Sequence, residues 1–181
     1  MRVITGRFRG MALLAPKGDD IRPTTDRVKE DVFNTLMPYI NEDGIFLDLF
    51  CGTGAMAVEA VSRGFNKAEL VDNSKTSLEL AAKNTQKTKH PEFFRLIRSD
   101  AKSYLLATKK EYDIIFMDAP YGLKNTDELI SIITSRGLLK EGGMLVVEKS
   151  SKDASCVCGY TLHKEKKYSA AAVYYYKNVK E

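Results

Sequence analysis

The stretch Asp48-Leu49-Phe50-Cys51-Gly52-Thr53-Gly54-Ala55-Met56-Ala57 decides how this chain folds. Gly52 and Gly54, with Ala57 after them, fit the Gly-x-Gly-x-x-Gly/Ala pattern that joins a strand to a helix in nucleotide-binding folds. The apolar run 45–49 precedes the glycines, and a helical pattern over 55–63 follows them. Glycines let the backbone pass close to a nucleotide and present its N–H groups. The stretch therefore favours a nucleotide site, with an ordinary strand-to-helix turn as the alternative.

Short apolar runs alternate with helical patterns beyond this stretch. We expect strands at 45–49, 68–71, 94–97, 112–117 and 144–148, and helices at 55–63, 75–89, 101–108 and 126–135. Strands separated by helices of this length predict an α/β fold, with a mostly parallel twisted sheet and helices on both faces. The tail contains two more strand patterns, 160–167 and 172–177, which predict an antiparallel hairpin at one edge.

The N-terminal region differs from the rest in charge. Residues 1–29 hold seven basic and three acidic residues, which accounts for the whole net charge of +4. Such an arm is typical of a protein that binds a polyanion, and a solvated, flexible terminus is the alternative. We expect a single domain, with a basic arm or short β-hairpin at 1–24 and the main α/β domain at 25–181.

Composition excludes several classes of protein. The 181 residues are 44% hydrophobic and 29% charged, and no apolar run approaches the roughly 18 residues of a membrane helix. Three arginines lie among the first ten residues, where a signal peptide would be apolar, so we expect a cytoplasmic protein. The three cysteines, Cys51, Cys156 and Cys158, are too few for a disulfide framework, and we expect no metal site.

Four expected strands end in an aspartate, namely Asp48, Asp72, Asp100 and Asp118. The carboxyl ends of parallel strands form the ligand-binding edge of an open α/β sheet. Asp72 follows Gly54 by eighteen residues, a position from which a carboxylate accepts hydrogen bonds from ribose. Asp100 is placed to bind an adenine amine. Asp48 beside the glycines would repel a diphosphate and attract a cation, which favours S-adenosylmethionine over a dinucleotide.

The sequence Asp118-Ala119-Pro120-Tyr121 suits methyl transfer to the exocyclic amine of a base. Asp118 and the carbonyl of Ala119 would accept the two N–H bonds of the amine. Pro120 would hold that carbonyl in place through its fixed φ, and Tyr121 would stack on the base. A simple turn would account for the proline but not for the acid and the ring together.

These motifs resemble those of the RsmD family, which methylates N2 of one guanine in bacterial 16S ribosomal RNA. Asp118-Ala-Pro-Tyr121 is similar to the Asp/Asn-Pro-Pro-Tyr motif of amino methyltransferases, and the stretches 22–34, 47–54 and 59–64 resemble the family more closely. The resemblance extends from 2–10 to 147–148 and the tyrosine-rich tail. It implies a Rossmann-like class I methyltransferase that uses S-adenosylmethionine, needs no metal, and acts on 16S rRNA or a small-subunit assembly intermediate, as an expected monomer.

The resemblance also implies roles for individual residues. The catalytic residues would be Asp118, Ala119, Pro120 and Tyr121. The cofactor-binding residues would be Asp48, Phe50, Gly52, Gly54, Asp72, Asn73, Asp100 and Ala101. The RNA contacts would be Arg7, Arg9, Arg22 and Arg27. The chain departs from the family at Ala119, where proline is usual, at Thr53, where serine is usual, and at Asp72, where glutamate is usual.

Three other functions fit parts of the pattern. A DNA adenine or protein glutamine methyltransferase would share the chemistry, although those enzymes more often have asparagine at the position of Asp118. A nucleotide-binding dehydrogenase would fit the glycine pattern alone. A non-catalytic RNA-binding protein would fit the basic arm.

Overall fold

A computed structural model describes residues 1–16, 26–120, 125–150, 159–169 and 171–179. They form a seven-stranded sheet in the order β3-β2-β1-β4-β5-β7-β6. The strands are β1 (Phe46–Leu49), β2 (Ala68–Asp72), β3 (Phe94–Arg98), β4 (Tyr112–Asp118), β5 (Leu139–Ser150), β6 (Thr161–Lys167) and β7 (Ala171–Lys177). The α-helices are α1 (Asp26–Leu36), α2 (Ala55–Arg63), α3 (Lys75–Gln86), α4 (Ala101–Ala107) and α5 (Thr126–Ser135).

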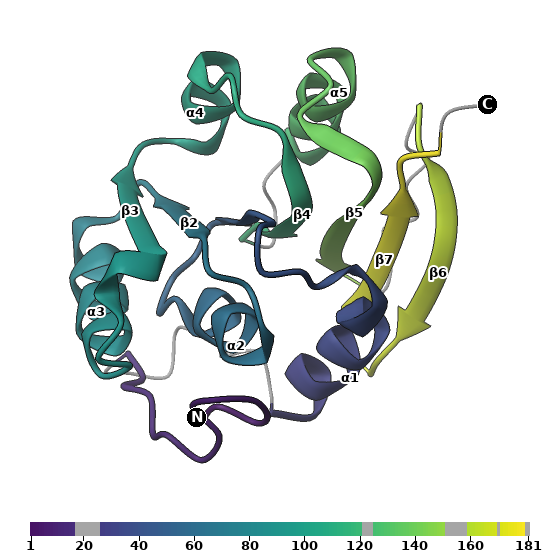
Figure 1. The fold of residues 1–181 in the computed structure, drawn as a ribbon. Coiled ribbons are helices and arrows are strands. Elements are labelled where there is room, and N and C mark those ends of the chain that lie inside the picture. Colours follow the sequence, from purple (N-terminus) through teal and green to yellow (C-terminus); the bar gives the residue numbers. More distant parts are fainter. Residues whose placement is uncertain (17–25, 121–124, 151–158, 170, 180–181) are drawn as a thin grey trace.

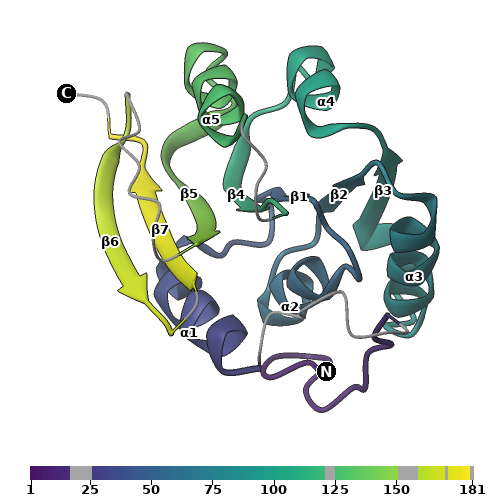
Figure 2. The same ribbon diagram turned by 180° about the vertical axis from the view of Figure 1, so that it is seen from behind.

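Strands β1 to β5 pair in parallel, whereas β7 pairs antiparallel with both β5 and β6. Helices α1, α2 and α3 cover one face of the sheet, and α4 and α5 cover the other (Figures 1 and 2). The predicted Rossmann-like fold with an antiparallel hairpin at one edge is therefore confirmed. In the described part of the chain, no helix is both long enough and apolar enough to span a membrane.

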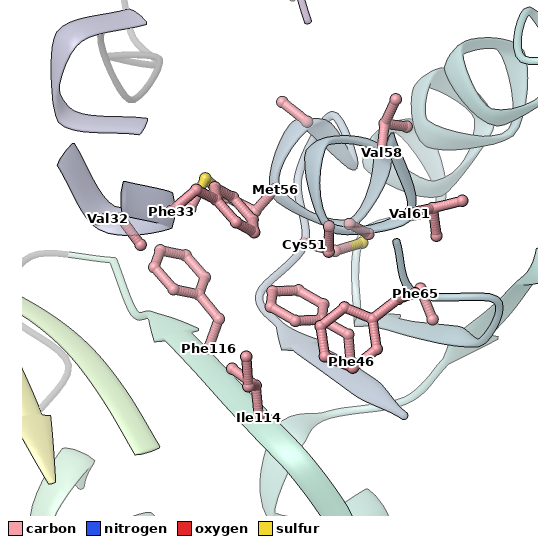
Figure 3. Packing of buried hydrophobic residues seen from close by; sticks show 14 of the residues in the cluster. Val32, Phe33, Phe46, Cys51, Met56, Val58, Val61, Phe65, Ile114 and Phe116 are labelled. Atoms are coloured by element: carbon pink, nitrogen blue, oxygen red, sulfur yellow. The ribbon is translucent and has the colours of Figure 1, made fainter. Parts of the chain in front are cut away.

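The core lies on both faces of the sheet and fixes the position of the central strands. All four residues of β1 are buried, since β1 is an inner strand covered by helices on both sides. On the α2 side, the rings of Phe33 and Phe65 pack at 6.1 and 5.9 Å from the ring of Phe46. Phe116 of β4 packs in the same cluster (Figure 3). This packing aligns the carboxyl ends of β1 and β4 side by side.

Helix α2 is unusual because eight of its nine residues are buried. Residues 1–14, here called the N-terminal segment, run along the side of α2 that faces away from the sheet (Figures 1 and 2). The buried carboxylate of Glu59 accepts hydrogen bonds from the backbone N–H groups of Ile4 and Thr5 at 2.8 and 3.1 Å. The same carboxylate pairs with Arg63 at 2.8 Å and with Lys29 at 3.7 Å.

The approach of the N-terminal segment to α2 requires a glycine. Gly6 has φ +92°, and a Cβ there would lie 1.9 Å from the backbone oxygen of Ser62. The Ser62 side chain also donates to the Thr5 carbonyl at 2.6 Å. The family-like stretches 2–10 and 59–64 are thus in direct contact, although more than fifty residues separate them in sequence.

Most element boundaries lie within two residues of the sequence expectations, and three elements differ by more. The expected N-terminal hairpin is a single antiparallel bridge between Arg2 and Ala12, because much of its backbone hydrogen bonding goes to α2. Helix α3 ends at Gln86 rather than at 89, and the positive φ of Lys89, 61°, is incompatible with its continuation. Strand β5 begins at Leu139 rather than at 144, because Leu139 pairs with Tyr112 before a register shift.

Candidate active site

The glycine loop connects β1 to α2 at the carboxyl edge of the sheet. Phe50, Gly52 and Gly54 all have positive φ, of 62°, 51° and 73°. Gly54 also lacks space for a side chain, since a Cβ would lie 2.9 Å from Leu70 Cδ2 and 3.2 Å from Ala81 Cβ. The loop geometry therefore depends on glycine at position 54, both for conformation and for packing.

Asp72 holds the glycine loop from the neighbouring strand. Its Oδ2 accepts a hydrogen bond from Gly52 N at 2.9 Å, and its Oδ1 accepts one from Ser74 N at 2.8 Å. A carboxylate oxygen has two lone pairs, so each oxygen can accept a further bond from a ribose hydroxyl. Asp72 is shorter than the usual glutamate, and in this position it is at the same time a brace for the loop.

A pocket of about 120 Å³ lies beside the loop at the ends of β2 and β3. Its lining residues are Phe50, Val71, Asp72, Asn73, Ser99, Asp100, Ala101, Lys102, Asn125 and Leu129. Five of the eight residues predicted to bind the cofactor therefore lie together here, while Asp48, Gly52 and Gly54 lie outside the lining. A larger hollow of about 230 Å³ is at the opposite edge, where Asp113 and Lys140 occupy the amino-terminal ends of strands.

Sequence reasoning missed Val71, Ser99, Lys102, Asn125 and Leu129 as pocket residues. The first three are adjacent or nearly adjacent in sequence to predicted residues, so the lining could have been extended to them. Asn125 and Leu129 lie at the start of α5, the helix that follows β4 in the chain. No sequence motif indicated that they would line the pocket. In the described part of the chain, the Asn125 Oδ1 atom is buried without a hydrogen-bond partner.

Asp100 is the exposed N-cap of α4. Its Oδ1 accepts a hydrogen bond from Ser103 N at 2.9 Å. Hydrogen bonds from the Ser103 side chain and backbone lower the pKa of Asp100 below its ordinary value. Asp100 is therefore an ionised acceptor at the rim of the pocket.

Asp48 lies beneath the glycine loop rather than in the pocket. It is 2% exposed, and its Oδ2 accepts a hydrogen bond from Ala57 N at 3.3 Å, in the first turn of α2. Burial raises the pKa of Asp48 well above its ordinary value, and the charges of Asp118 and Asp72 raise it further. A cation bound nearby would oppose this effect and favour the ionised form.

Asp118 ends β4 next to the glycine loop. Leu49, the last residue of β1, pairs with Met117, so Asp118 lies beside the start of the loop. Asp48 pairs with Phe116, and side chains two residues apart share a face of the sheet, so Asp118 and Asp48 lie on the same face. Burial raises the pKa of Asp118 to about 6.

The remainder of the predicted catalytic motif is only partly described. Ala119 is half-buried and Pro120 is exposed, whereas Tyr121 lies outside the described residues. Cys156 and Cys158 also lie outside them, and among the residues with a described placement no group of three His, Cys, Asp or Glu residues is arranged to hold a metal ion.

The predicted RNA-binding arginines are in different situations. Arg7 donates from Nε to the Val61 carbonyl at 2.8 Å and from Nη2 to the Phe65 carbonyl at 2.8 Å. These bonds cap the C-terminal end of α2, which is the end remote from the glycine loop, so Arg7 has a structural role that the sequence did not indicate. Arg7, Arg9 and Arg27 are all exposed, and Arg22 is outside the described residues.

Comparison with known proteins gives a consistent result. The model of a family described as "Conserved hypothetical protein 95" matches residues 1–177. "Putative rRNA methyltransferase YlbH" of Bacillus subtilis (strain 168) is 36% identical over 151 residues, which is 82% of each protein. "Ribosomal RNA small subunit methyltransferase D" of Escherichia coli (strain K12) is 33% identical over 168 residues, 92% of this chain and 84% of the relative. The solved structure titled "Putative methyltransferase yhhF from Escherichia coli" has a TM-score of 0.87 at 32% identity, and the match covers 100% of this chain and 99% of that one.

Proposed function

The chain belongs to the RsmD family of ribosomal RNA methyltransferases, and from this premise we propose that it methylates the exocyclic N2 amine of a guanine in small-subunit ribosomal RNA, using S-adenosylmethionine. One observation carries the proposal: the half-buried carboxylate of Asp118 lies directly beside the glycine loop, on the strand next to β1. A methyl donor held at the loop and an amine held at Asp118 would therefore meet at the same edge of the sheet.

The residues around the pocket fit the parts of S-adenosylmethionine. Asp72 can accept from the ribose hydroxyls while it braces Gly52. Asp100, with Ala101 beside it, lies at the rim where the adenine amine needs an acceptor, and Phe50 supplies an apolar wall. Burial raises the pKa of Asp48, and a cationic ligand at the loop would oppose that effect, so that the ionised carboxylate would attract the ligand. When bound, the cofactor supplies a methyl group on a positively charged sulfur.

Asp118 positions the amine and stabilises the charge that develops on its nitrogen. The nitrogen of guanine N2 is a weak nucleophile because its lone pair is delocalised into the ring. Asp118 accepts one N–H bond and the Ala119 carbonyl accepts the other, which favours the tetrahedral nitrogen of the transition state. The methylated nitrogen would carry one proton in excess, and the Asp118 carboxylate would take that proton. Tyr121 stacks on the base, as the resemblance to the family implies.

The test is a methylation assay with small ribosomal subunits from cells that lack the gene. Subunits and deproteinised 16S rRNA are incubated separately with labelled S-adenosylmethionine, and the RNA is digested to nucleosides. We expect label in N2-methylguanosine, and the better substrate distinguishes an assembly intermediate from free rRNA. Label on an adenine, on a protein glutamine, or on neither RNA sample would refute the proposal. An Asp118→Asn variant, which keeps the shape of the side chain, is the control for contaminating activity.

A further inference from the structure

Asn84 connects three segments of the molecule at one point. It lies on α3 and is 0% exposed. Its Oδ1 accepts a hydrogen bond from Leu14 N at 2.7 Å, and its Nδ2 donates to the Leu14 carbonyl at 3.1 Å and to the Thr53 carbonyl at 2.9 Å. The side chain therefore joins α3 to the N-terminal segment and to the glycine loop at the same time.

The bond from Asn84 acts on the part of the loop with the most conformational freedom. Thr53 stands between Gly52 and Gly54, and the next N–H, that of Gly54, donates to the Cys51 carbonyl at 2.7 Å. The peptide between Thr53 and Gly54 is thus held on both sides. Glycine populates many backbone conformations, so without the Asn84 bond the loop would sample forms that do not fit the cofactor. Apparent affinity falls in proportion to the fraction of competent loop.

The N-terminal segment is attached to the rest of the protein at several further points. Glu59 holds its residues 4 and 5, and Lys87 donates from Nζ to the Ala12 carbonyl at 2.6 Å. The Thr53 hydroxyl contacts the Met1 sulfur at 3.8 Å. Unlike the bonds of Glu59 and Lys87, the Asn84 amide ties the segment to the loop itself. Displacement of Leu14 would remove two of the three partners that orient this amide.

We propose that Asn84 is a positioning residue that couples the docking of the N-terminal segment to the shape of the glycine loop, and hence to cofactor affinity. The inference rests on the proposed function, in which the loop binds S-adenosylmethionine and the segment, with exposed Arg9, contacts RNA. Coupling between two binding sites is reciprocal. RNA that holds the segment in place therefore increases affinity for the cofactor, and bound cofactor favours RNA binding to the same degree.

Calorimetric titration with S-adenosylhomocysteine tests the proposal without any RNA. We expect Asn84→Ala to weaken binding about tenfold, since it removes the hydrogen bonds that hold the loop and the segment together. Lys87→Met is the matched control, because Lys87, the C-cap residue of α3, lies three positions after Asn84 and bonds to the segment at Ala12. For this control we expect a change of less than about twofold, within the range of a surface substitution.

Steady-state kinetics separate positioning from a purely structural role. We expect Asn84→Ala to raise the KM for S-adenosylmethionine by about tenfold with a much smaller effect on kcat, as lost ground-state binding predicts. A variant that melts at a lower temperature but keeps the wild-type dissociation constant and KM would overturn the proposal, because Asn84 would then only stabilise the fold.

Hydrogen exchange of the wild-type protein provides a test that needs no variant. S-adenosylhomocysteine should slow exchange at Gly52 and also at Val3 and Leu14, whose amides bond within the segment and to Asn84. Protection of the loop without protection of these two amides would overturn the coupling and leave the proposed function intact. Failure of the wild-type protein to bind S-adenosylhomocysteine would instead refute the proposed function.

Discussion

The substitution Glu59→Gln should strongly destabilise the protein, although Glu59 does not line the candidate pocket. Glu59 and its cationic partners Lys29 and Arg63 have side chains that are 0%, 1% and 3% exposed. Loss of one partner from a buried ion pair leaves uncompensated charge and costs about 3–5 kcal/mol. For a protein of this length, each kcal/mol shifts the melting temperature by about 2–4 °C, so we expect a decrease of roughly 10 °C.

The matched control for this prediction is Glu79→Gln. Glu79 pairs with Lys75 at 3.7 Å on α3, but the two side chains are 60% and 72% exposed. Exposed pairs contribute about 0–1 kcal/mol, so the control should melt within a few degrees of the wild type. Thermal and urea unfolding at neutral pH would compare the two variants. Equal, small shifts for both would refute the idea that Glu59 anchors the N-terminal segment.

The pH dependence of the Glu59 variant gives a second check. Burial lowers the pKa of Lys29, and the charge of Glu59 opposes that effect. A lysine with a lowered folded-state pKa adds stability above its unfolded pKa of about 10.4, and this stability is lost as pH falls towards the folded pKa. Removal of the Glu59 charge lowers the pKa of Lys29 further. The free energy of unfolding should therefore fall more between alkaline and neutral pH in the variant than in the wild type.

Three further substitutions and one pH profile test the candidate site. Asp118→Asn should lower kcat about a hundredfold or more while binding of S-adenosylhomocysteine stays within a few fold, measured by single-turnover methylation and calorimetry. Burial raises the pKa of Asp118 to about 6, and only the ionised carboxylate can accept a hydrogen bond and a proton from the amine. The wild-type rate should therefore rise with pH through about 6, and a flat profile below neutrality would contradict this role. Gly54→Ala should weaken cofactor binding by about tenfold or more, because Gly54 has a φ of 73° and an added Cβ would lie 2.9 Å from Leu70. Gly142→Ala is the control, since a Cβ there would meet open space. Asp48→Asn should raise the melting temperature of the free protein, because it removes a buried carboxylate, and should weaken cofactor binding by about tenfold. Unchanged affinity would show that the charge of Asp48 does not contribute to binding.

Local patterns were sufficient for the elements around the site. Helices α2 and α5 have the predicted bounds, because helical periodicity and the flanking glycines and turns are properties of neighbouring residues. The acids at the ends of β1, β2 and β4 were placed correctly at one edge, since parallel strands bring their carboxyl ends together. Strand β5 was predicted too short, because its first residues are extended only through pairing with β4.

The roles of several polar residues depended on contacts between distant parts of the chain. Arg7 was predicted as a phosphate contact, and a guanidinium that binds phosphate can equally cap a helix. Its position against Val61 and Phe65 can be read only from the fold. The sequence pattern of α2 gives no sign that Glu59 is buried. It is buried because the N-terminal segment covers it. Asn125 enters the pocket from α5, which the sequence did not connect with the cofactor.

For this protein, the order of strands and helices, the glycine loop and the row of terminal aspartates follow from the sequence, because periodicity, turn preference and strand ends are set by residues close in the chain. Tertiary structure alone decided that Glu59 would be an internal anchor, that Arg7 would cap α2, and that Asn84 would join the first fourteen residues to the glycine loop. Each of these outcomes depends on which polar group meets which partner after the layers pack. A buried hydrogen bond between residues fifty or more positions apart leaves no local pattern in the sequence.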